Sequence, residues 1–95
     1  MNIIFIDTTS NEEITVALIM NGKQFEKKAK VGRDRPQMVL PLLDQLLKEN
    51  TLSLKDIDEI EVREGPGSFT GIRVGFSIGN ALGYSLGVPV NGKKA

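Results

Sequence analysis

A glycine-rich loop with neighbouring hydroxyl groups is the part of the sequence best suited to chemistry. Gly65-Pro66-Gly67 permits a tight turn, and Ser68 or Thr70 can cap a following helix. The first-turn amides of such a helix favour a phosphate or carboxylate. The loop matches neither the P-loop nor the dinucleotide-binding pattern, because no Gly-Lys-Ser/Thr or Gly-x-Gly-x-x-Gly is present. Anion contact and a plain tight connection therefore both stay open.

A second candidate lies directly after the first apolar run. An acidic residue followed by hydroxyl residues, Asp7-Thr8-Thr9, can hold a metal-bound phosphate or can simply form an Asx-type turn. The sequence contains no His and no Cys, so the usual acid–base pairs, thiol nucleophiles and zinc ligands are missing. We expect no catalytic residue and no metal site. The possible phosphate contacts are Asp7, Thr8, Thr9, Gly67, Ser68 and Thr70.

Length and charge narrow the class of protein further. The 95 residues suffice for one domain, expected to span residues 1–95. Twelve basic residues balance twelve acidic ones, and this neutrality argues against a general nucleic-acid binder. The apolar segments are too short or too polar for a signal peptide or a membrane span, which predicts a cytoplasmic protein.

The first third of the sequence predicts an antiparallel meander. A short apolar run at 2–6 indicates a buried strand, and residues 13–20 alternate between apolar faces. Asn21-Gly22 is a strong hairpin signal, and a third strand follows at 23–31. Its lysines discourage edge-to-edge pairing. A local basic patch stays open as an alternative to a merely solvated edge; it comprises Lys23, Lys27, Lys28, Lys30 and Arg33.

The remaining sequence alternates between helices and strands. Helices are predicted over 37–50 and 70–86, with a helical turn over 53–57 between them. Strands are predicted at 60–63 and from Pro89 onward. The order β-β-β-α-β-α-β indicates an α/β fold with a mixed sheet and helices packed on it.

Both predicted helices have more packing surface than one small domain needs. The apolar arc of 37–50 is wider than a single packed face. The helix over 70–86 has glycine at every fourth position, and each interior glycine costs about 1 kcal/mol relative to alanine. Close packing must recover that cost, either on the protein's own sheet or against a partner helix. The glycines are Gly71, Gly75, Gly79, Gly83 and Gly87.

Three motifs together resemble one protein family. These are Ile6-Asp7-Thr8-Thr9, Leu40-Pro41-Leu42-Leu43 and the run from Gly65 to Gly75, which reads Gly-Pro-Gly-Ser-Phe-Thr-Gly-Ile-Arg-Val-Gly. The sequence resembles the bacterial TsaB (YeaZ) proteins over residues 1 to about 90, which correspond to the family's N-terminal half. The resemblance implies the RNase H-like fold of the actin/Hsp70/sugar-kinase (ASKHA) group, of which this chain would be one half-domain.

The resemblance also implies a role and partners. It implies a non-catalytic scaffold that forms homodimers or pairs with TsaD, with the ATPase TsaE joining the assembly. That assembly modifies tRNA with threonylcarbamoyl-adenosine (t6A37). ATP and Mg²⁺ would then bind only at a complex interface, and tRNA would be reached indirectly. The implied partner surface consists of Met38, Leu42, Gln45, Arg73, Ser77, Asn80, Ala81 and Tyr84.

The sequence departs from the family pattern in three places. Arg35-Pro36 stands where the family commonly has His-Ser or His-Thr, and Arg63-Glu64 precedes the glycine loop where small or polar residues are usual. The family's second half is not expected within these 95 residues, so one copy would lack a complete nucleotide cleft. Two alternatives to the scaffold follow: a phosphate- or nucleotide-binding half-domain with a site shared in a dimer, and an orphan homodimer with changed partners.

Overall fold

The computed structural model describes residues 1–30 and 35–93. Val31 and Arg33, predicted in the third strand and the basic patch, lie outside the described residues. No helix in this described part is long and apolar enough to cross a membrane. The elements are β1 (Asn2–Asp7), β2 (Glu13–Met20), β3 (Lys23–Lys30), α1 (Arg35–Glu49), the short 3-10 helix η1 (Leu54–Asp56), β4 (Glu59–Val62) and α2 (Phe69–Leu86).

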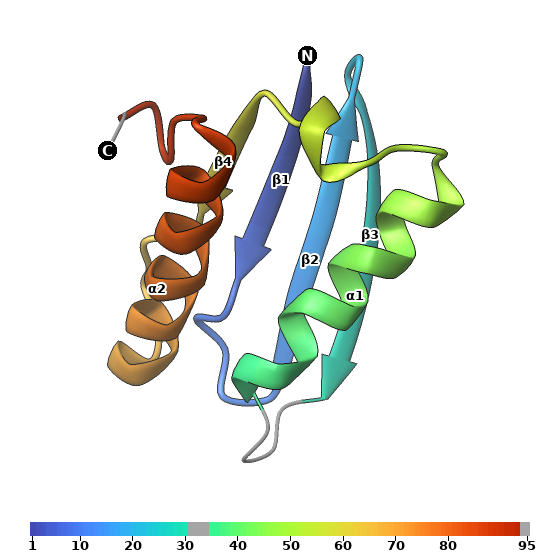
Figure 1. Ribbon diagram of the computed structural model, residues 1–95. Coiled ribbons are helices and arrows are strands. Elements are labelled where there is room, and N and C mark those ends of the chain that lie inside the picture. The colour runs from blue at the N-terminus through green and yellow to red at the C-terminus, as the bar shows by residue number, and fades with distance from the viewer. Residues whose placement is uncertain (31–34, 94–95) are drawn as a thin grey trace.

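A four-stranded sheet forms the centre of the fold, with strand order β3-β2-β1-β4 (Figure 1). β2 pairs antiparallel with both β1 and β3, and β4 pairs parallel with β1. The hairpin between β2 and β3 turns at Asn21-Gly22, where both residues have positive φ. This is the predicted turn, and it pairs Met20 with Lys23. The mixed sheet is therefore confirmed.

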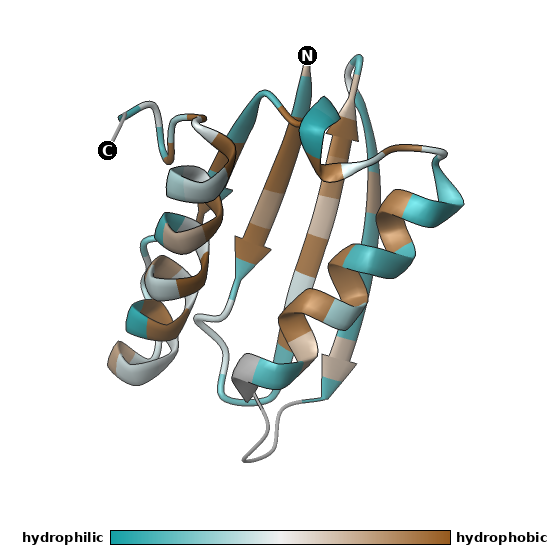
Figure 2. Cartoon of the chain, in the orientation of Figure 1, coloured by the Kyte–Doolittle hydropathy of each residue, from teal (hydrophilic) through white to brown (hydrophobic). Residues whose placement is uncertain are grey.

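Both helices cover the same face of the sheet, as Figure 1 shows. Strand alternation places the large buried side chains of β1, β2 and β4 on that face, including Ile4, Ile6 and Ile60. The apolar side of α1 packs against them through Leu43 and Leu46, each 2% exposed. Figure 2 shows that hydrophobic residues recur along β1, β2 and α1. One core therefore holds both helices to the sheet.

Within the described residues, the final strand predicted from Pro89 does not form. Val90 makes only an isolated parallel bridge to Ile60, and the chain turns back immediately at Asn91-Gly92. Both turn residues have positive φ, at 51° and 79°, so this pair acts as the earlier Asn-Gly pair does in the hairpin. The predicted strand from Pro89 is therefore replaced by a single bridge and a turn.

The lysines of β3 are partly neutralised by ion pairs. Lys27 Nζ lies 2.8 Å from a Glu49 carboxylate oxygen of α1, and Lys28 Nζ lies 3.4 Å from one of Glu13. Exposed pairs of this kind contribute little to stability. They do lower the net positive charge of the edge strand, which weakens the case for a basic nucleic-acid patch there.

Candidate functional site

The outer face of α2 presents the predicted partner residues to solvent. Ser68 caps the helix by accepting a hydrogen bond from the Gly71 N–H at 3.1 Å, and Gly87 ends it in the left-handed conformation. All five predicted residues of this helix are exposed, and Tyr84 is 80% exposed. They are Arg73, Ser77, Asn80, Ala81 and Tyr84. The face therefore includes one Tyr and one Arg, two residue types that are enriched in protein interfaces.

The glycine row of α2 faces inward. A Cβ atom built at Gly79 would collide with the Val62 side chain of β4, and one at Gly83 would collide with Val90. The four glycines of the row within the helix are buried, because the missing side chains let the helix axis approach the sheet; Gly87 ends the helix and is exposed. The sequence left open whether these glycines pack on the protein's own sheet or against a partner helix, and the structure shows that they pack on the sheet. A partner can contact α2 only from its other side.

The three α1 residues predicted for the partner surface differ in their exposure to solvent. Gln45 is exposed and Met38 is half-buried. Leu42 is only 8% exposed and belongs to the domain core, so its assignment to the surface is corrected. The exposed leucine is Leu40, at 53%. Two residues span about 200° of an α-helix, so a helix that buries Leu42 turns Leu40 outward.

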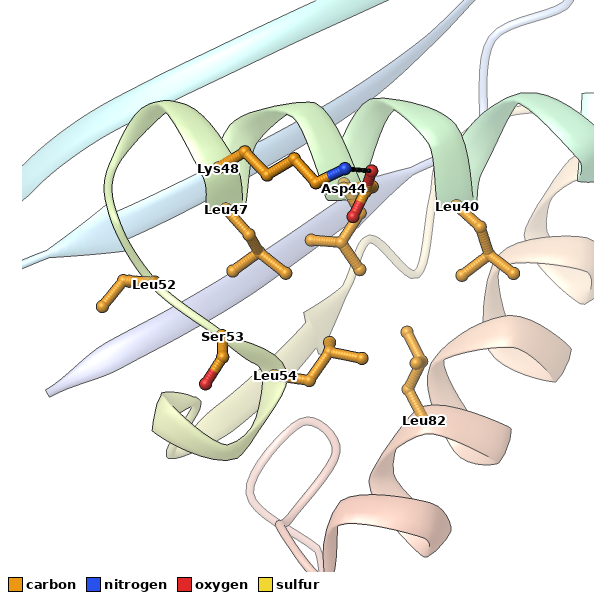
Figure 3. A pocket seen from close by; sticks show the side chains of 9 residues that line it. Leu40, Asp44, Leu47, Lys48, Leu52, Ser53, Leu54 and Leu82 are labelled. Atoms are coloured by element: carbon orange, nitrogen blue, oxygen red, sulfur yellow. Dashed lines mark ion pairs between the residues drawn. The ribbon is translucent and has the colours of Figure 1, made fainter.

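A shallow apolar hollow separates the two helices. Leu40 of α1, Leu54 of η1 and Leu82 of α2 converge on it, with the Asp44–Lys48 ion pair at its rim (Figure 3). Its volume is about 460 Å³. A second hollow of about 310 Å³ shares Leu40 and Leu82 and continues along α2. Ser77, Ala81 and Ser85 line this second part. The two predicted residues Ser77 and Ala81 therefore border an apolar groove rather than a flat face.

Two exposed side chains of this region were not predicted. Leu40 was part of the apolar arc, but the arc did not show which edge would remain open. Phe69, in the first turn of α2, is 82% exposed. Its position directly after the capping Ser68 is the sequence signal that places it at the helix end, away from the core.

The two predicted phosphate-binding segments lie side by side. The Ser68 N–H donates to the Thr9 carbonyl at 2.8 Å, and the buried Thr8 hydroxyl donates to the Gly71 carbonyl. Gly67 leaves no room for a side chain, because a Cβ there would collide with Thr9. The two candidate segments, which the sequence presents separately, therefore meet at one junction in the structure. The polar groups, however, bind one another across the junction.

Asp7 is also engaged within this junction. Its Oδ1 accepts hydrogen bonds from the Thr9 N–H at 2.9 Å and the Thr9 hydroxyl at 2.7 Å. Its Oδ2 lies 3.7 Å from a guanidinium nitrogen of Arg63. This is the Asx-type turn considered from the sequence. Across residues 1–30 and 35–93, no group of three His, Cys, Asp or Glu side chains is arranged to hold a metal ion.

The geometry describes a small α/β half-domain with a structural glycine junction and an exposed two-helix face. A family model described as "TsaD: tRNA N6-adenosine threonylcarbamoyltransferase" matches residues 29–92. The TsaB protein of Haemophilus influenzae, named for tRNA threonylcarbamoyladenosine biosynthesis, is 35% identical over 82 residues, covering 86% of this chain and 35% of that protein. The Escherichia coli TsaB is 35% identical over 92 residues, covering 97% of this chain and 39% of that protein.

A solved structure agrees with these sequence relatives. YeaZ from Pseudomonas aeruginosa superposes with a TM-score of 0.85 at 31% identity, over 94% of this chain and 41% of that one. The close match confirms the RNase H-like half-domain. The chain belongs to this tRNA threonylcarbamoyladenosine family and, within it, to the TsaB (YeaZ) group. It spans about two fifths or less of the length of these three relatives and matches their N-terminal part.

Proposed function

We propose that this chain is a non-catalytic TsaB-type scaffold in the threonylcarbamoyl-adenosine modification of tRNA. Its outer α1/α2 face would bind a second copy or a TsaD-type protein. The names of the relatives support the pathway. The observation that supports this binding surface is the apolar groove between the two helices. Both helices already pack against the sheet through their other sides. TsaE and tRNA would then meet this chain only within the larger complex.

Burial and exposure support this choice of surface. Leu40, which lines the groove, is 53% exposed, and Tyr84 on α2 is 80% exposed, although each is large enough to stabilise a contact by burial. Aromatic side chains in particular contribute strongly at interface centres. The absence of His and Cys from the sequence fits a subunit that supports a reaction performed elsewhere.

The nucleotide-binding alternative has weaker support. The two segments proposed to hold a phosphate are hydrogen-bonded to each other. The Asp7 carboxylate accepts hydrogen bonds from Thr9 and forms an ion pair with Arg63. A shared site in a dimer would have to break some of these hydrogen bonds. The orphan homodimer would use the same helix face and differs only in its partner, so one experiment separates it from the scaffold.

The test is the solution mass, measured by light scattering for the chain alone and mixed with a TsaD-type protein. We expect self-association and exchange into a mixed complex, and we expect Ala81→Arg to abolish both. The matched control is Gln24→Arg, which adds the same charge at an exposed position of β3. A dimer that ignores TsaD would favour the orphan. A mass unchanged by Ala81→Arg would overturn the proposed surface.

A further inference from the structure

The outer edge of β4 is fully hydrogen-bonded, although the described part of the chain forms no fifth strand beside it. Four backbone groups point outward from this strand, two from Ile60 and two from Val62. The Ile60 N–H donates to the Pro89 carbonyl at 3.0 Å, and the Asn91 N–H donates to the Ile60 carbonyl at 2.9 Å. The Val62 N–H donates to Asn91 Oδ1 at 2.7 Å, and Asn91 Nδ2 donates to the Val62 carbonyl at 3.0 Å. Asn91 therefore serves three of the four groups.

The side chain of Asn91 takes the place of a continuing strand. Val90 and Lys93 exchange two backbone hydrogen bonds, at 2.9 and 3.0 Å, which closes the Asn91-Gly92 turn and directs the chain away from β4. A parallel neighbour would have offered Val62 one carbonyl and one N–H. The carboxamide supplies the same acceptor and donor from one side chain.

We propose that Asn91 is a clasp that closes the β4 edge of the sheet against the addition of another strand. An unpaired strand edge is a template for pairing with a second chain. The opposite edge, β3, carries Lys23, Lys27, Lys28 and Lys30. The two edges are thus protected by different devices, charge on β3 and a side-chain mimic on β4. This inference is independent of the α1/α2 face.

The chain contains a matched control for this residue. Asn21 also begins an Asn-Gly turn and has the same φ of 51°, so alanine at either position carries the same left-handed backbone cost. The Asn21 side chain is exposed, and no hydrogen bond joins it to another described residue. The difference between Asn91→Ala and Asn21→Ala therefore isolates the two bonds to Val62.

Amide hydrogen exchange at Val62 tests the clasp directly. We expect exchange at Val62 to be about tenfold faster in Asn91→Ala than in Asn21→Ala, since one lost hydrogen bond to a buried group corresponds to roughly that factor. Both variants are compared in the Ala81→Arg background, which keeps helix-face association out of the measurement. In that background we expect Asn91→Ala, and not Asn21→Ala, to form larger assemblies by light scattering as concentration rises.

A second variant keeps the test decisive if Asn91→Ala does not fold. Asn91→Asp keeps the acceptor for the Val62 N–H but sets a carboxylate against the Val62 carbonyl. We expect its edge to open at neutral pH and to close again on acidification, when the protonated carboxyl can donate. Equal Val62 exchange in the variants at 91 and 21 would overturn the proposal. So would an opened edge that produces no additional association.

Discussion

Adding one methyl group to the glycine row should destabilise the fold. Gly79 lies in the interior of α2, where alanine would improve helix propensity by about 1 kcal/mol. Its Cβ would, however, collide with Val62, which is 4% exposed and β-branched and therefore has little freedom to move. Overpacking of this kind costs about 1–3 kcal/mol. Because the stiff side chain favours the upper range, we expect Gly79→Ala to lose about 1–2 kcal/mol net.

Urea unfolding followed by far-UV circular dichroism measures this loss of stability. In thermal unfolding, each 1 kcal/mol lost should lower Tm by about 4–8 °C in a domain of this size. Asn80→Ala is the control, because the next residue is exposed and should gain about 0.5 kcal/mol from propensity alone. Gly79→Ala combined with Val62→Ala should be more stable than the sum of the two single effects predicts. A Gly79→Ala protein as stable as the wild type would refute the close packing of α2 on β4.

Three further outcomes follow from the structure. Leu42→Glu should lose about 3 kcal/mol or more in urea unfolding because it buries an unpaired charge, whereas Leu40→Glu should stay within about 0.5 kcal/mol of wild type and weaken association instead; equal stability of the two variants would contradict the burial pattern. The pKa of Asp56 is lowered because its carboxylate accepts hydrogen bonds from the Ser53 N–H at 2.9 Å and the Ser53 hydroxyl at 3.1 Å. The contribution of the ionised Asp56 carboxylate to folding stability is therefore present at neutral pH and is lost as the pH falls through that lowered pKa. Ser53→Ala should raise the pKa of Asp56 toward its ordinary value in an NMR titration. An ordinary pKa of Asp56 in the wild type would contradict this prediction. Calorimetric titration with ATP and Mg²⁺ should give no binding heat at millimolar nucleotide, and saturable heat would revive the shared-site alternative.

Local sequence patterns predicted most of the fold because they act over short distances. Asn21-Gly22 defines the hairpin, and period-two alternation orients β2. The period-four glycine row identified a closely packed helix, although only the structure shows that Val62 and Val90 are its neighbours. The meeting of the Asp7 turn with the glycine loop was also predictable in outline, because the C-terminal ends of parallel β1 and β4 lie at one edge.

The remaining features depend on contacts between distant segments. Leu42 and Leu40 belong to one apolar arc, and only the placement of the sheet decides which of them is buried. The Asn91 clasp joins residues 29 positions apart. The local sequence therefore predicts a turn at Asn91-Gly92 but not the hydrogen bonds to Val62. The ion pair of Asp7 depends on a distant segment as well, since Arg63 directly follows β4.

The central claim is that the chain associates through the outer α1/α2 face. Chemical-shift mapping of the isotopically labelled chain, titrated with a TsaD-type protein and separately with its own unlabelled copy, tests this claim most directly. We predict that the largest shifts fall at Leu40, Ser77, Ala81 and Tyr84, while Gln24 on β3 stays unchanged. Shifts confined to β3, or to the sheet face away from the helices, would contradict the account.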